Sequence, residues 1–84
     1  MCRNITTLRG LEPGPTAEEI EAAARQYVRK VSGVQTTSTA TEAAFDVAVR
    51  RIAEVTTHLL ADLPPRRRPP ATIPPLRRLA ATKR

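Results

Sequence analysis

Two residues of this 84-residue chain are of types that often carry out chemistry, and each type occurs once. Cys2 follows the initiator methionine, and removal of that methionine leaves a free amino group beside the thiol, a pair that can act as a nucleophile or bind a metal. His58 has no HxxxH or CxxC motif beside it. No glycine-rich loop is present to complete a site. We therefore expect no enzymatic activity and no cofactor. Cys2 is a candidate reactive thiol, and the simpler alternative is that it is a small side chain packed under the rest of the protein.

The basic residues are concentrated at the C-terminus. The chain has 14 Lys and Arg against 8 Asp and Glu, a net charge of +6, but residues 64–84 contain seven of the basic residues and no acid. The seven are Arg66, Arg67, Arg68, Arg77, Arg78, Lys83 and Arg84. Such a segment can contact nucleic-acid phosphates weakly, non-specifically and with a steep salt dependence. No aromatic residues are interleaved for base stacking, so we expect no sequence-specific readout. A tail that binds nothing is an equal alternative, because Arg, Pro and Ala use GC-rich codons and an unconstrained tail in a GC-rich genome would have this composition.

The same segment is rich in proline. Six of the eight prolines lie in residues 64–84, as three Pro-Pro pairs. Proline pairs favour extended polyproline-type backbone, and Ile73, Leu76 and Leu79 are too few to form a core. We expect residues 64–84 to be a disordered basic tail.

A first helix is predicted over residues 17–32. Thr16 stands three residues before Glu19, which is the spacing of a capping box. Apolar residues then recur at helical spacing, and Gly33 follows as a residue suited to a left-handed C-cap.

A second, longer helix is predicted over residues 40–63. Thr39 stands three residues before Glu42 and predicts a cap, and Pro64 ends the helix. Its apolar stripe runs along one face for about six turns. The large residues that we assign to a partner-facing stripe are Phe45, Val49, Ile52, Val55, Leu59 and Leu63.

These elements predict an all-α fold in which residues 1–63 form an antiparallel two-helix hairpin. Ile5, Leu8 and Leu11 are three apart and predict a short N-terminal turn packed on the hairpin. The apolar stripe of the second helix is longer than the first helix can cover. This mismatch indicates a partner on that helix, either a second copy or another protein.

The function predicted from these features is a non-enzymatic protein-interaction module that self-associates or binds another protein. No stretch approaches the roughly 18 apolar residues that cross a bilayer, and no secretory signal is evident, so we expect a cytoplasmic protein without membrane contact. The alternative is a nucleic-acid or ribosome-associated accessory protein that contacts phosphate through the basic tail.

Three segments carry a resemblance to a known family: MCRNITTLRGLEP, TAEEIEAAARQYVRKVSG and EAAFDVAVRRIAEVTTHLL. Over residues 1 to about 65 the chain resembles a family of short bacterial proteins of unknown function that open with Met-Cys-Arg-Asn-Ile. The resemblance implies a small helical protein and brings no activity, cofactor or catalytic residue with it. The chain departs from the family pattern at Thr36, Thr37 and Thr39, where the family has lysines and a proline, and in its uniformly basic tail.

Overall fold

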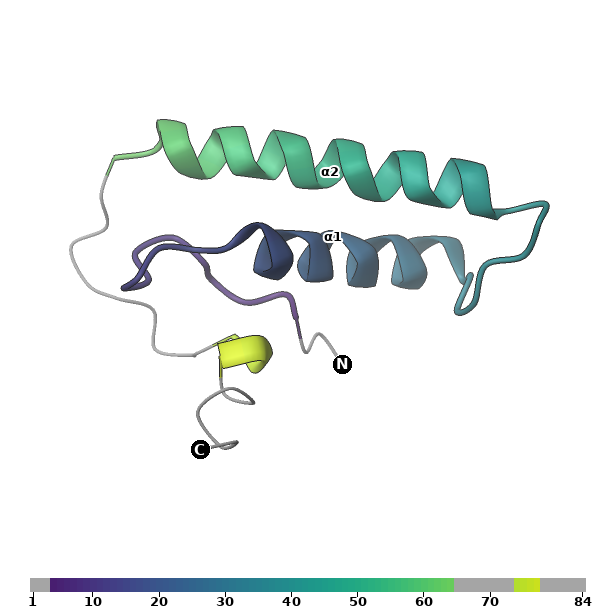
Figure 1. The fold of residues 1–84 in the computed structure, drawn as a ribbon, viewed down its shortest axis with the longest axis horizontal. Helices are drawn as coiled ribbons and strands as arrows, with labels where there is room; N and C mark the ends of the chain where they lie inside the picture. The colour runs from purple at the N-terminus through teal and green to yellow at the C-terminus, as the bar shows by residue number, and fades with distance from the viewer. Residues whose placement is uncertain (1–3, 65–73, 78–84) are drawn as a thin grey trace.

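The computed structural model describes residues 4–64 and 74–77. In this part of the chain two helices, α1 (Ala17–Ser32) and α2 (Glu42–Asp62), lie side by side and run antiparallel, and no strand is present (Figure 1). The predicted all-α hairpin is confirmed. Neither helix of the described part is long and apolar enough to cross a membrane.

Local sequence signals determine both ends of α1. The Thr16 hydroxyl accepts a hydrogen bond from the Glu19 amide at 3.1 Å, and the Glu19 carboxylate accepts one from the Thr16 amide at 2.9 Å. This is the predicted capping box, which satisfies two amides that the helix leaves unpaired. At the other end Gly33 has φ of 76° and donates to the Arg29 carbonyl. The left-handed conformation explains why glycine suits this position.

The start of α2 differs from the prediction. The helix begins at Glu42, with Thr41 as the N-cap residue, and no side chain makes a capping bond. The Thr41 hydroxyl instead accepts a hydrogen bond from the Ser38 amide at 2.8 Å. The Ser38 carbonyl accepts one from the Glu42 amide, also at 2.8 Å. The predicted cap at Thr39 is wrong because this residue lies inside the turn that precedes the helix.

The core has two parts along the hairpin. Near the inter-helix connection, Ala24 and Val28 of α1 pack against Phe45 and Val49 of α2. All four side chains are buried, because the helical spacing of each pair aims both of its members at the other helix. This cluster holds the two helices together.

The N-terminal segment closes the open end of the hairpin. Leu8 and Leu11 are buried with Ile20 of α1, and Leu60 of α2 packs against them. The Leu11 amide donates to the Leu8 carbonyl at 3.4 Å, which makes the tight turn expected from their spacing. This part of the chain therefore covers a stretch of α2 that α1 does not reach. The predicted packing of the N-terminal turn is confirmed for Leu8 and Leu11, whereas Ile5 is exposed.

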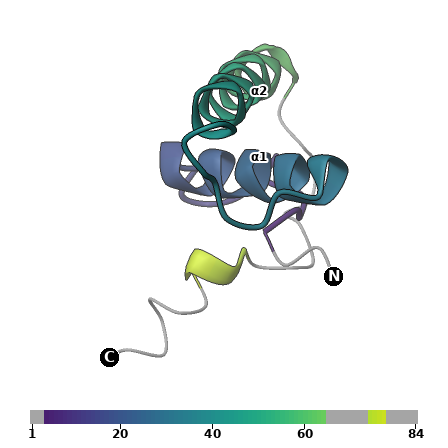
Figure 2. The same cartoon turned by 90° about the vertical axis from the view of Figure 1, so that its right-hand side faces the viewer.

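Four residues of the C-terminal region depart from the expectation of a disordered tail. Residues 75–77 form a helical turn on the side of α1 opposite to α2 (Figures 1 and 2). The Arg77 amide donates to the Pro74 carbonyl at 3.0 Å, and Pro74 is buried. The remaining stretches for which we predict disorder, 65–73 and 78–84, lie outside the described residues.

Candidate interaction surface

The predicted partner-facing stripe of α2 divides into a buried part and an exposed part. Phe45 and Val49 are 6% and 2% exposed and pack in the core against α1. The prediction that these two residues face a partner is therefore wrong. Val55 and Leu59 are 67% and 52% exposed, and Leu63 is also exposed. The division follows the faces of the helix: Phe45 and Val49 point toward α1, and Leu60 in the second half of α2 is also covered. Val55 and Leu59 lie on the flank of α2 beside this buried row.

Ile52 stands at the boundary between the two parts. It is half-buried and packs against the core cluster of Ala24 and Phe45. Ala48 is also half-buried, one turn before Ile52. Together with Val55 and Leu59 these two residues form one continuous row, which we call the α2 face.

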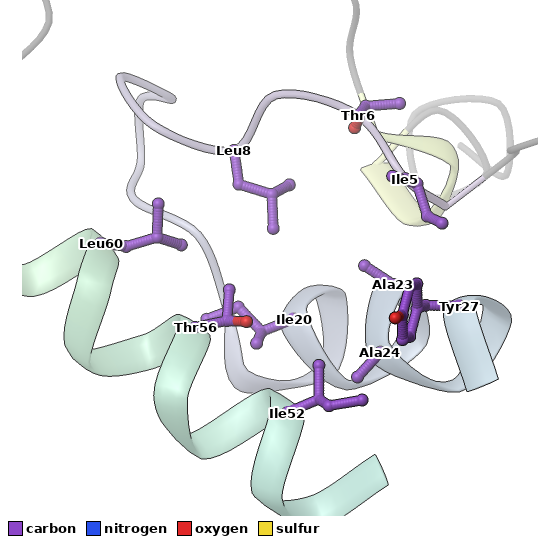
Figure 3. A pocket seen from close by; sticks show the side chains of 10 residues that line it. All are labelled: Ile5, Thr6, Leu8, Ile20, Ala23, Ala24, Tyr27, Ile52, Thr56 and Leu60. Carbon is purple, nitrogen blue, oxygen red and sulfur yellow. The ribbon is translucent and has the colours of Figure 1, made fainter. Parts of the chain in front are cut away.

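A cavity of about 290 Å³ lies between the N-terminal segment and both helices (Figure 3). Leu8 points from the segment toward the helices, and Tyr27, Ile52 and Leu60 line the cavity from the helical side. Its walls are almost entirely apolar, and among the residues that the structure describes no charged side chain lines it. The cavity shows that the N-terminal segment spans the hairpin without filling the space beneath it.

One polar atom in this region has no partner. The Oγ1 atom of Thr6 is buried, and no hydrogen bond to it is formed in the described part of the chain. A buried hydroxyl without a partner costs about 1 to 3 kcal/mol. The N-terminal segment is held in place by other contacts than Thr6: its leucines pack on the hairpin, and the Asn4 amide donates to Gln26 Oε1 at 2.7 Å. The Nε and Nη2 of Arg9 also donate to the Pro64 carbonyl, at 3.0 and 2.7 Å.

The edge of the hairpin that faces away from the α2 face is polar. Arg25 lies 3.7 Å from the Glu21 carboxylate and 4.0 Å from the Asp46 carboxylate, and its guanidinium is 5.8 Å from the centre of the Phe45 ring. The pairing of Glu21 with Arg25 is one of the helical charge pairs expected from the spacing of acids and bases in α1. This edge therefore carries charged side chains, in contrast to the apolar α2 face.

A second polar cluster joins the C-terminal turn to the start of α1. The Nε of Arg77 donates to Glu19 Oε2 at 2.8 Å, and the Glu19 side chain is only 3% exposed. Burial raises the pKa of the Glu19 carboxyl, but hydrogen bonds from Thr16 and the adjacent Arg77 guanidinium together lower this pKa below its ordinary value. Sequence reasoning assigned Arg77 to polyanion contact and missed this acidic partner, 58 positions away.

The remaining candidate residues are placed as follows. Cys2 and six of the seven basic residues of the tail lie outside the described residues, so the thiol and the phosphate contact stay predictions. His58 is exposed on α2. Among residues 4–64 and 74–77, no group of three or more His, Cys, Asp or Glu is arranged to hold a metal ion.

Comparison with known proteins identifies a family and no characterised relative. A family model described as "Uncharacterized conserved protein (DUF2277)" matches residues 1–84. The chain belongs to this family. No curated protein and no solved structure matches the chain.

The DUF2277 match extends the resemblance seen in the sequence. That resemblance reaches to about residue 65 and treats the basic tail as divergent, whereas the family model continues through residue 84. The C-terminal turn at 75–77 and its contact with α1 therefore lie inside the DUF2277 region.

Proposed function

We propose that this chain is a non-enzymatic protein-interaction module of the cytoplasm that pairs with a second copy of itself through the α2 face. The observation that carries the proposal is the exposure of Val55 and Leu59 in a helix whose neighbouring face is buried. Contiguous exposed apolar patches mark interaction surfaces, and Val55 and Leu59 lie one turn apart on the same side of α2.

The spacing of the α2 face suits pairing with another helix. Ala48, Ile52, Val55 and Leu59 are separated by four, three and four residues. This alternation is the a/d pattern with which helices of a coiled coil pack side chains into each other's grooves. A helix is therefore a better match for this face than a flat surface.

The face is also complementary to itself. In an antiparallel pairing about a two-fold axis that passes between residues 53 and 54, Ile52 faces Val55 of the second copy and Ala48 faces Leu59 of the second copy. A two-fold interface requires this reciprocity: if residue i of one copy contacts residue j of the other, then residue j of the first copy contacts residue i of the second. Each large leucine then packs over a small alanine, so the two helices can approach closely.

The expected association is weak. Full burial of a Val or Leu side chain contributes about 1.5 to 3 kcal/mol, and association costs at least about 4 kcal/mol in lost freedom of motion. The α2 faces of two copies supply a modest surplus over this cost. The dimer should therefore form and dissociate with protein concentration.

Size-exclusion chromatography with light scattering tests the proposal on the full chain. We expect a dimer that dissociates on dilution, and we expect Leu59→Glu to give a monomer with unchanged helical content. Ala61→Glu is the matched control, because Ala61 is exposed on α2 but lies away from the α2 face. A wild-type chain that stays monomeric at high concentration, or equal effects of the two variants, would contradict the proposal.

A further inference from the structure

The Arg77 side chain is held by more acceptors than a surface ion pair normally provides. Its Nη2 donates to the Pro13 carbonyl at 2.6 Å, to the Gly14 carbonyl at 2.7 Å and to Glu19 Oε1 at 3.3 Å. Its Nε donates to the other carboxylate oxygen of Glu19. One edge of the guanidinium therefore faces two backbone carbonyls and both oxygens of one carboxylate, an arrangement that fits the rigid fork of arginine donors.

The groups that surround the guanidinium are held in place by the loop and the first turn of α1. The Glu19 carboxylate is oriented by the Thr16 amide, and the Glu19 amide is bonded to the Thr16 hydroxyl. Both bonds join residues three apart, so they form without the C-terminal turn. Residues 13–19 therefore supply the acceptors of the site, and the C-terminal turn supplies the Arg77 side chain that occupies it together with the buried Pro74.

The electrostatics of the site explain why it needs a carboxylate. The start of a helix carries partial positive charge, which favours anions and disfavours cations. Glu19 benefits from this field and is almost fully buried beneath Arg77, whose side chain is 21% exposed. A guanidinium at this position is stabilised by the carboxylate and the two carbonyls, and the helix dipole by itself would repel it.

We propose that residues 13–19 form a binding site for the arginine side chain of a peptide, with Arg77 of the same chain as its resident occupant. Residues 74–77 show which peptide conformation fits the site. Pro74 is buried, and the Arg77 amide donates to the Pro74 carbonyl, which closes a tight turn. An arginine-bearing segment of another protein that folds into such a turn competes with Arg77 for the site. This site lies apart from the α2 face, so it does not depend on dimer formation.

The test uses the full-length Arg77→Ala variant, which vacates the site. The probe is a capped peptide of sequence Pro-Pro-Leu-Arg, and the control peptide carries Lys in place of Arg. Backbone amide chemical shifts measured by NMR report binding. We expect saturable shifts at Thr16 and Glu19 with the arginine peptide, binding about tenfold weaker or more with the lysine peptide, and weaker binding to the wild-type chain.

Two further variants assign the binding to Glu19. In the Arg77→Ala background, Glu19→Gln should abolish the shifts, and Glu18→Gln should leave them unchanged, because Glu18 is exposed in the same helical turn. If Glu19→Gln unfolds the chain, the comparison of arginine and lysine peptides on Arg77→Ala still decides the question. No saturable shift on Arg77→Ala, or equal binding of both peptides, would overturn the proposal.

Discussion

The two helices of the hairpin are stabilised in different ways. α1 has a capping box at its start and a left-handed glycine at its end, and its buried apolar residues face α2 and the N-terminal segment. α2 is longer, has no side-chain cap, and leaves Val55 and Leu59 exposed beside a buried row. The comparison indicates that α1 is specified by local signals, whereas α2 depends on tertiary contacts and, in our proposal, on a second copy.

The largest expected effect concerns the dependence of α2 on the core. Phe45→Ala should lower the free energy of unfolding by about 3 to 5 kcal/mol, because it empties the centre of the contact between the helices. Urea denaturation followed by circular dichroism measures the loss. A loss below about 1 kcal/mol would show that α2 does not rely on this cluster.

Two neighbouring leucines separate the covered face of α2 from the exposed one. Leu60→Ala should cost about 2 kcal/mol, since Leu60 packs against Leu8 and Leu11. Leu59→Ala should change stability by less than about 0.5 kcal/mol at dilutions where the chain is monomeric. Thermal or urea unfolding of both variants at low concentration checks this. Equal losses would contradict the assignment of Leu59 to the free surface.

The starts of the two helices give a smaller effect. Thr16→Ala removes the side-chain half of the capping box and should cost about 1 kcal/mol. Thr39→Ala removes a hydroxyl that makes no capping bond and should leave stability unchanged. The same denaturation experiment measures both, and a cost at Thr39 equal to that at Thr16 would restore the cap predicted from the sequence.

The smallest expected effect is a pH dependence that arises at α1. Because the pKa of Glu19 is lowered in the folded chain, its carboxylate stabilises the fold above the ordinary glutamate pKa, and this contribution is lost as the pH falls through the folded value. The difference in unfolding free energy between wild type and Glu19→Gln should therefore shrink as the pH falls below the ordinary glutamate pKa and through the lower pKa of the folded chain. A constant difference over this range would show that Glu19 is not stabilised as an anion.

Signals within a few residues made much of the fold predictable. The spacing of Thr16 and Glu19, the glycine at position 33 and the proline at position 64 fix the ends of α1 and the end of α2. The start of α2 is harder to predict, because Thr39 and Thr41 are both residue types that cap helices. The hydrogen bonds between Ser38 and residues 41 and 42 make Thr41 the N-cap residue.

Contacts between distant residues were not predictable in the same way. Periodicity identified the apolar stripe of α2, but the stripe is wider than α1 and the N-terminal segment cover. Which flank of it stays exposed depends on how α2 is rotated against those two elements. The pairing of Arg77 with Glu19 joins residues 58 positions apart across a proline-rich stretch, so no local pattern indicates it.

Disulfide trapping tests the central claim, that the α2 face pairs with itself, most directly. In a Cys2→Ser background, Ala48→Cys combined with Leu59→Cys should form a covalent dimer under mild oxidation. The proposed two-fold axis places position 48 of each copy opposite position 59 of the other copy. Within one helix the two positions are about 16 Å apart, too far for an internal disulfide. Leu59→Cys alone should cross-link poorly. Efficient dimer formation by the double variant supports the account, and no covalent dimer, or equal cross-linking by Leu59→Cys alone, would contradict it.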